Sequence, residues 1–288
     1  MVRGWRYSMA SLVQRYLQIL NLPPKKPTYD YLAEIMTAHL STFAFENISK
    51  LLYFRDHREK GYYHPSLQEF LDGYEKHHFG GMCFVANSHL LTLLKSLGFQ
   101  GYHVKLGQGH MAIIIQLEKE RLYVDCGAAA PFFRPVRFES DPNNQSRFGA
   151  DVVEIRPVPE EPGLYRYNRY FKGEPTGPLW EFNPDQKRDL SDFKENIIAS
   201  YAPGATFMKI LRCQLWQPEQ ERSVSLVNNR FSIRYIDGRV ENQQLGSIEE
   251  IEDVLAHYFQ LPKLPVREAV AVLESLGVSI FEVSSSST

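Results

Sequence analysis

Three residues, Cys83, His110 and Asp125, have the side-chain types that together perform nucleophilic catalysis. Cys83 follows two glycines and begins an apolar run that is typical of a buried helix. Amide groups and the dipole at a helix start favour a thiolate. A thiol nucleophile needs a base within hydrogen-bonding reach, and the base needs a carboxylate to orient it. The pattern predicts this chemistry, although a cysteine at a helix start is more often a small core residue.

His110 and Asp125 are expected on one β-hairpin, because short β-rich runs lie on both sides of Lys119. Side chains alternate between the faces of a strand. If Leu117 pairs with Glu120, the loop has an even number of residues and His110 lies diagonally beside Asp125, about 7–8 Å away between backbones. An odd loop would place them on opposite faces. The sequence therefore permits a triad in the order Cys, His, Asp.

Other kinds of site have weaker support. The chain has no Cys-x-x-Cys or His-x-x-x-His spacing, so we expect no metal site. Gly107 and Gly109 lack the third glycine and the βαβ context of a dinucleotide-binding loop. The pair His77-His78 is expected at a solvated helix end.

The elements expected to position these residues change in type along the chain. Helices are predicted over 11–20, from the N-cap Thr28 to Leu40, from Pro65 in a first turn, and from Cys83 to a glycine stop at Gly98. After the hairpin, the composition of residues 130–190 is typical of an irregular β-barrel or sheet. Beyond them we expect a short helix near 192–196 and more strands. The last two helices are predicted to begin with a capping box at 247–250 and near residue 266.

Composition excludes several classes of protein. The chain has 288 residues, 43% of them apolar, and a formal net charge of −2. This composition is typical of a globular protein, and it lacks the excess of basic residues that is usual in proteins that bind nucleic acids or anionic membranes. The apolar runs are too short to span a membrane, and the N-terminus does not read as a secretory signal. Three cysteines argue for a reducing compartment, so we expect a cytoplasmic protein.

Five groups of residues, in register over nearly the whole chain, resemble the motifs of the arylamine N-acetyltransferases. They are His39-Leu40, Ala44-Phe45-Glu46-Asn47, Gly80-Gly81-Met82-Cys83 with Asn87, His110 with Val124-Asp125-Cys126-Gly127, and Asp192-Phe193 with Asn196 and Thr206-Phe207. The resemblance implies a transfer of acetyl from acetyl-CoA to an arylamine, arylhydrazine or arylhydroxylamine. It also implies a ping-pong mechanism through an acetyl-cysteine.

The resemblance also implies an α+β multi-domain fold with a papain-like Cys-His-Asp core. The expected units are a helical bundle (1–98) carrying the cysteine, a central β-barrel (99–205) carrying the histidine and aspartate, and an α/β lid (206–288). The catalytic residues would be Cys83, His110 and Asp125. Expected CoA contacts are Gly107, Gln108, Gly109, Gly127 and Thr206. Expected acceptor contacts are Phe45, Ala128 and Phe207. We expect a monomer or homodimer.

Three features depart from the family pattern. Phe79 stands where the motif has an arginine, so Glu46 needs another partner. The connection between Cys83 and His110 is shorter than usual. Ala128 replaces a bulky ring, which predicts a differently shaped acceptor pocket unless Phe132 or Phe133 fills the space.

Two alternative functions stay open at this point. The first is a cysteine hydrolase or amide synthase that uses the same triad with another acyl donor. The second is a catalytically weak paralogue that binds CoA or a partner, which the substitution at Phe79 favours and the intact triad opposes.

Overall fold

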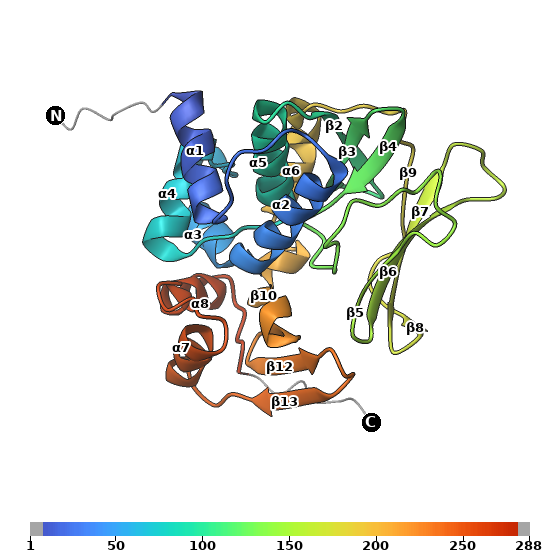
Figure 1. The fold of residues 1–288 in the computed structure, drawn as a ribbon. Coiled ribbons are helices and arrows are strands. Elements are labelled where there is room, and N and C mark those ends of the chain that lie inside the picture. Colours follow the sequence, from blue (N-terminus) through green and yellow to red (C-terminus); the bar gives the residue numbers. More distant parts are fainter. Residues whose placement is uncertain (1–7, 282–288) are drawn as a thin grey trace.

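Four helices with clear start signals form one group in the N-terminal third of the chain (Figure 1). Thr28 accepts a hydrogen bond from the Tyr31 amide, and Ser66 forms a capping box with Glu69. The computed structural model describes residues 8–281. In it these helices are α1 (Met9–Ile19), α2 (Tyr29–Thr42), α4 (Leu67–His77) and α5 (Cys83–Ser96). The predicted helices are confirmed, except that Pro65 precedes the N-cap of α4 instead of lying in its first turn.

A further helix, α3 (Ile48–Asp56), escapes the sequence pattern because polar residues interrupt its apolar repeat. Ser49 and Lys50 are buried beside apolar neighbours. The short strand β1 (Phe45–Glu46) precedes this helix and pairs with β10 far along the chain. Because α3 also packs against α8, this part of the N-terminal segment belongs spatially with the C-terminal elements.

The hairpin predicted around Lys119 is the centre of a three-stranded antiparallel sheet. Its strands, in spatial order, are β2 (Gln100–Leu106), β3 (His110–Leu117) and β4 (Glu120–Val124). Leu117 pairs with Glu120, so the loop has the expected even number of residues. Strands β2 and β3 pack against α5. The sheet therefore holds the start of β3 and the end of β4 against the helix that begins at Cys83.

The expected β-barrel is wrong: the strands described in residues 8–281 form three open sheets. The second sheet contains β5 (Gln145–Phe148), β6 (Asp151–Pro157), β7 (Tyr165–Phe171) and β8 (Glu174–Pro175), with β9 (Trp180–Phe182) also paired to β7. The link between β4 and β5 carries Pro131, Pro135 and Pro142, which have no amide hydrogen for a ladder. One isolated bridge, between Tyr123 and Val136, forms there.

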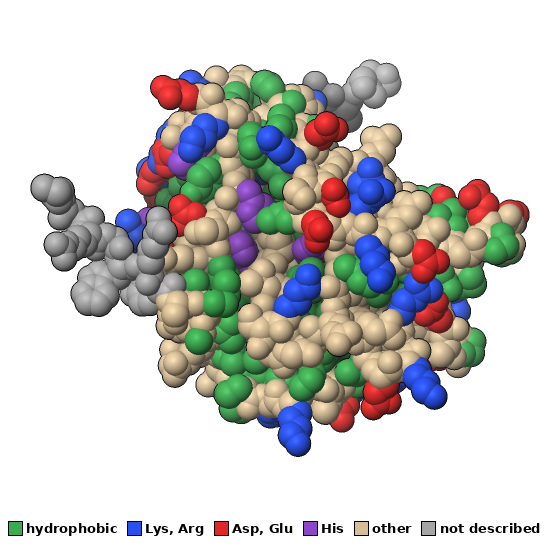
Figure 2. Space-filling model, turned by 90° about the horizontal axis from the view of Figure 1, so that it is seen from above, with side chains coloured by type: hydrophobic (Ala, Val, Ile, Leu, Met, Phe, Trp, Pro, Cys, Tyr) green, Lys and Arg blue, Asp and Glu red, His purple; other side chains and the backbone are tan. Residues whose placement is uncertain are grey.

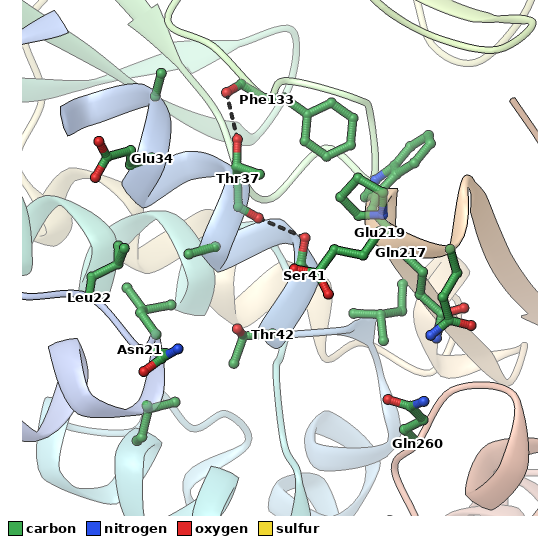
Figure 3. A pocket seen from close by; sticks show the side chains of 18 of the residues that line it. Asn21, Leu22, Glu34, Thr37, Ser41, Thr42, Phe133, Gln217, Glu219 and Gln260 are labelled. Atoms are coloured by element: carbon green, nitrogen blue, oxygen red, sulfur yellow. Dashed lines mark hydrogen bonds between the residues drawn. The ribbon is translucent and has the colours of Figure 1, made fainter. Parts of the chain in front are cut away.

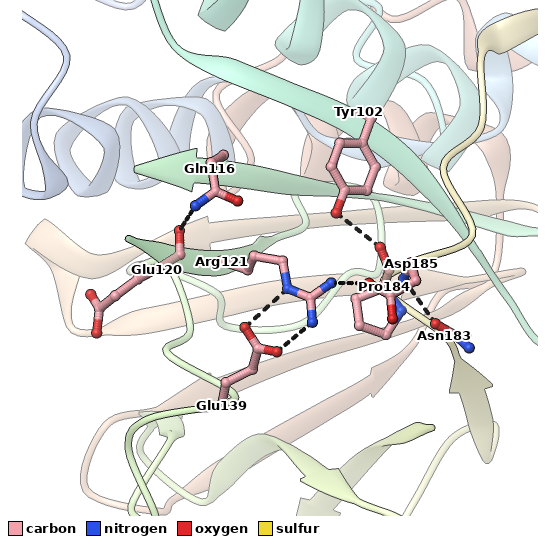
Figure 4. A network of polar contacts seen from close by, with 8 residues as sticks. All are labelled: Tyr102, Gln116, Glu120, Arg121, Glu139, Asn183, Pro184 and Asp185. Carbon is pink, nitrogen blue, oxygen red and sulfur yellow. Dashed lines mark hydrogen bonds and ion pairs between the residues drawn. The ribbon is translucent and has the colours of Figure 1, made fainter. Parts of the chain in front are cut away.

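Polar contacts connect the hairpin sheet to the segments on either side of the second sheet (Figure 4). The Arg121 guanidinium on β4 binds the carboxylates of Glu139 and Asp185. The Tyr102 hydroxyl on β2 donates to the Pro184 carbonyl at 2.9 Å. These contacts fix the segment that follows β9 against the hairpin sheet.

Four C-terminal strands and the N-terminal β1 form a five-stranded antiparallel sheet, which lies with two helices at the bottom of the view in Figure 1. A short connecting segment comes first, with the 3-10 turns η2 (Leu190–Phe193) and η3 (Thr206–Met208) around α6 (Lys194–Ser200). The other elements are β10 (Arg212–Gln217), β11 (Arg222–Val227), β12 (Arg230–Tyr235), β13 (Val240–Gln244), α7 (Ile248–His257) and α8 (Val266–Ser275).

The predicted capping box at α7 is half formed. Ser247 accepts from the Glu250 amide, but the Glu250 carboxylate accepts from the Gly246 amide at 2.9 Å. The helix start is therefore where the sequence predicted it, with a different partner for the glutamate.

Side chains of opposite charge are mixed on the surface. Lys or Arg and Asp or Glu side chains alternate over the face in Figure 2, as the near-zero net charge suggests. No helix described within residues 8–281 has the length and apolar character needed to cross a membrane.

Candidate active site

Cys83 is the first residue of α5, and two glycines fix the chain that leads to it. A Cβ on Gly80 would lie 2.1 Å from the Ala44 carbonyl oxygen, and Gly81 has a φ of +81°. Cys83 itself is partly exposed, whereas Cys126 and Cys213 are buried and burial raises the pKa of both thiols. Cys83 is therefore the thiol that a substrate can reach.

Hydrogen bonds from amides and a hydroxyl replace the missing arginine as partners of Glu46. Its carboxylate accepts from the amides of Gly80 and Gly81 at 3.0 and 2.8 Å and from the amide and hydroxyl of Ser49 at 2.8 and 2.6 Å. Burial raises the pKa of Glu46, and these donors oppose that effect. The carboxylate thereby holds the loop before Cys83 in place without an ion pair.

His110 and Asp125 lie together, as the even loop predicted. Nε2 of His110 is 2.7 Å from Oδ2 of Asp125, and both side chains are buried. Burial opposes the charged imidazolium, but the charge and hydrogen bond of Asp125 and the contact with Cys83 outweigh it and raise the pKa of His110 to about 10. Burial also opposes ionisation of Asp125, whose pKa His110 nevertheless lowers. The pair is thus an imidazolium with a carboxylate.

Asn87 and Gly127 bring the hairpin against α5. The Asn87 amide donates to Oδ1 of Asp125 at 2.9 Å and to the Met111 carbonyl at 2.6 Å, and its oxygen accepts from the Cys126 amide at 3.0 Å. A Cβ on Gly127 would lie 2.5 Å from Cα of Cys83. Since Asn87 is one helical turn after Cys83, both side chains meet the hairpin on the same face of α5.

The residues predicted to contact CoA lie in different parts of the structure. The turn Gly107–Gly109 lies between Trp180 and Asn196, and the Asn196 amide donates to the Gln108 carbonyl at 2.7 Å. Gly127 lies against Cys83 instead, and Thr206 begins η3. Close packing against Trp180 and Asn196 explains why both of these turn residues are glycines. Their contact with CoA stays a prediction.

The structure brings two of the three predicted acceptor residues together. The rings of Phe45 and Phe207 meet edge to face, with centroids 5.7 Å apart. Ala128 precedes Ala129, whose carbonyl accepts from Gln214, the residue that pairs with Phe45. The two rings that could have filled the space beside Ala128 pack against other rings. Phe132 packs against Tyr123 and Tyr167, and Phe133 packs against Phe148 and Trp216.

Three neighbours of the site escaped the sequence reasoning. The Tyr123 hydroxyl donates to Oδ2 of Asp125 at 2.8 Å, and the Trp180 ring stacks on His110. Lys50 is buried over the Tyr201 ring, where burial lowers its pKa to about 8 and the Cys83 charge opposes that change. Tyr123 stands two residues before Asp125 and could have been found by strand alternation, whereas nothing in the sequence marks the other two.

Two cavities differ in their relation to these residues. A small, mainly apolar cavity next to Cys83 is lined by Lys50, Met82, Phe84 and Tyr201, among others. An open groove of about 990 Å³ between α2 and β10 is lined by other residues, such as Thr37 in Figure 3. Neither cavity is lined by Cys83, His110 or Asp125 themselves. Within residues 8–281 no group of three or more His, Cys, Asp or Glu side chains is arranged to hold a metal ion.

The chain is similar to known N-acetyltransferases in sequence and in fold. A family model described as N-acetyltransferase matches residues 28–266. The arylamine N-acetyltransferase of Salmonella typhimurium has a similar structure, with a TM-score of 0.75, 19% identity, and coverage of 93% of this chain and 100% of that chain. The Mycobacterium marinum enzyme in complex with CoA gives a TM-score of 0.74, 18% identity, and coverage of 92% and 97%.

The sequences of curated proteins gave no match. The family model alone spans well over half of the chain, and the solved structures agree with it in fold. The chain therefore belongs to the arylamine N-acetyltransferase family and is an acyltransferase.

Proposed function

We propose that the protein transfers acetyl groups from acetyl-CoA to aromatic amines through an acetyl-Cys83 intermediate. The observation that carries the proposal is the His110–Asp125 pair at 2.7 Å beside the accessible thiol at the start of α5. CoA as the donor is supported by family membership and by the related M. marinum structure, which contains CoA. Arylamines, arylhydrazines and arylhydroxylamines are the proposed acceptors.

In the first half-reaction, the proton of Cys83 already lies on His110, and the thiolate attacks the thioester carbonyl. The tetrahedral intermediate collapses with loss of the CoA thiolate, which receives that proton from His110. Asp125 holds the imidazole through Nε2 and stabilises the imidazolium. The first amides of α5, at Cys83 and Phe84, come before the helix supplies its own acceptors, and we assign them to the oxyanion.

In the second half-reaction, the amine nitrogen attacks the acetyl carbonyl of Cys83. His110 removes a proton from the amine as the C–N bond forms and the Cys83 thiolate leaves. The products are the N-acetylated amine and the free enzyme. Phe45, Ala128 and Phe207 line the proposed acceptor side, and Gly107, Gln108, Gly109, Gly127 and Thr206 the proposed CoA side. We propose a cytoplasmic protein that acts as a monomer or homodimer.

An acceptor-dependence experiment separates this proposal from a hydrolase. Release of CoA from acetyl-CoA is measured with and without an arylamine, together with the N-acetylated product. We expect sustained release only with the amine, in a one-to-one ratio to product, and none with Cys83→Ser. Sustained release without amine would indicate a hydrolase, and no release with any amine would indicate a binding protein.

A further inference from the structure

One aromatic ring outside every motif of the sequence lies flat on the proposed base. The Trp180 and His110 rings have centroids 4.1 Å apart and planes 11° apart, which is a parallel stack. His110 is 7% exposed, and Trp180 is half-buried. The indole therefore covers one face of the imidazole, while the edge of that ring meets Asp125 through Nε2.

The fold fixes the Trp180 ring from several sides. Its strand β9 pairs Trp180 with Tyr167 on β7, and the two rings lie 5.2 Å apart. The Gly107 amide donates to the Glu181 carbonyl at 3.0 Å. A Cβ on Gly107 would lie 2.7 Å from Cδ1 of Trp180, so a glycine is required for the ring to sit where it does. The contacts of Tyr102 and Arg121 hold the chain just after β9 (Figure 4).

We propose that Trp180 is a positioning residue for His110, which fixes the imidazole plane between Asp125 and Cys83 and favours its protonated form. This proposal rests on the proposed function of His110 as the base. The face of an indole is electron-rich and attracts a cation that lies over it. The stacked ring also prevents the imidazole from tilting away from the Asp125 carboxylate.

Other ionisable groups around His110 also affect whether its imidazole is protonated. Asp125 and Cys83 act on it directly. Tyr123 binds the same carboxylate oxygen as His110, and Lys50 acts on Cys83. All four can stay unchanged while Trp180 is replaced, so the contribution of the indole can be measured separately.

Fluorescence gives a readout that a merely structural tryptophan would not provide. The chain contains Trp5, Trp180 and Trp216, so the variant W5F/W216F leaves Trp180 as the only emitter. An imidazolium stacked on indole quenches its emission, and neutral imidazole does so far less. We expect the emission to rise as pH increases through the deprotonation of His110. The midpoint should move to lower pH in Cys83→Ala, because the thiolate that helps to hold the proton is lost.

His110→Gln in the same background is the matched control, and it should abolish the rise. A pH titration that is the same with and without His110 would overturn the proposal. This measurement needs no acetyl transfer. It therefore tests the Trp180–His110 stack even if the proposed enzymatic function fails.

Kinetics of two variants provide the second arm. Trp180→Phe keeps an aromatic face and should hold kcat within about threefold of wild type, whereas Trp180→Leu should lower kcat about tenfold with little change in KM, because a misplaced catalytic group slows the chemical step. Alkylation of Cys83 by iodoacetamide at neutral pH should also be slower in Trp180→Leu. Wild-type kcat and an unchanged alkylation rate in Trp180→Leu would overturn the proposal. If Trp180→Leu does not fold, Trp180→Phe and the fluorescence titration decide.

Discussion

Neighbouring hydrogen-bond donors already bind the Glu46 carboxylate. This chain therefore does not need the arginine of the family motif as a partner for it. Phe79 uses that position for apolar packing: it is buried, and its ring lies 6.0 Å from Tyr53 and 5.0 Å from His77. The substitution thus alters packing and leaves the carboxylate satisfied.

We predict that restoring the motif arginine destabilises this protein. Phe79→Arg would place a guanidinium among rings and should lower the free energy of unfolding by about 3–5 kcal/mol, whereas the control Phe79→Leu should cost about 1 kcal/mol. Urea unfolding measures both. An Arg variant as stable as wild type would show that the guanidinium is accommodated there and would contradict the apolar role of Phe79.

The small side chain at Ala128 predicts an unusual preference for acceptors. Phe132 and Phe133 pack elsewhere, so neither takes the place of the missing ring. Ala128→Phe should add about 0.5–1.5 kcal/mol of ring–ring attraction for small arylamines and exclude larger ones. We expect kcat/KM to rise for the first and fall for the second. An unchanged ranking of acceptors would refute this account of the pocket and leave the triad intact.

Residue types and spacing permitted His110 and Asp125 to lie together near Cys83, and the family resemblance predicted it. Each belongs to a local pattern: a helix start, or one strand of a hairpin with an even loop. Trp180 could not be predicted, because it reaches the site from β9, which lies outside the motifs. Lys50 could not be predicted either, because a lysine just after the Asn47 motif gives no sign that α3 buries it beside the site.

At the scale of elements, the site is a contact between the start of α5 and the end of β4. Gly127 sets how close they come, since a Cβ there would lie 2.5 Å from Cα of Cys83. Helices and hairpins with strong local signals were predictable. The helix α3 could not be predicted, because its buried face is partly polar. The open form of the sheets could not be predicted either, because it depends on pairing between distant strands.

Gly127→Ala should push β4 away from α5 and lower kcat about 100-fold, because small displacements of catalytic groups are costly. Gly204→Ala is the matched control, since nothing lies within 4 Å of a Cβ there. That variant should keep wild-type activity and a stability within about 0.5 kcal/mol. Full activity in Gly127→Ala would show that the close approach is not needed. Thermal unfolding of both variants separates misfolding from misplacement.

Across the whole molecule, the two apolar cores do not follow the order of the chain. One contains α1, α2, α4, α5 and much of the first two sheets, and the other joins α3 and Met111 to the C-terminal elements. The units 1–98, 99–205 and 206–288 stay a prediction. Local sequence patterns carry no information on which distant segments share a core.

Three buried histidines should make the fold sensitive to acid. Burial lowers the pKa of His39 and His89 to about 3 and that of His103 to about 4. Between pH 6.5 and 4 the unfolded chain binds protons that the folded chain does not, so stability should fall with falling pH, by up to about 4 kcal/mol per pH unit for three groups. Urea unfolding at several pH values measures the slope, and His103→Gln should reduce it by about a third. A flat profile would contradict this account.

The central claim is that Cys83 carries the acetyl group between donor and acceptor, and mass spectrometry of the protein mixed with acetyl-CoA alone tests it most directly. We predict one added acetyl group per chain, located on the peptide that contains Cys83 and lost when an arylamine is added. Cys83→Ser should acquire none, while Cys126→Ser should still be labelled, because Cys126 is buried. An acetyl group found on Cys126 or Cys213, or one that the amine does not remove, would contradict the mechanism.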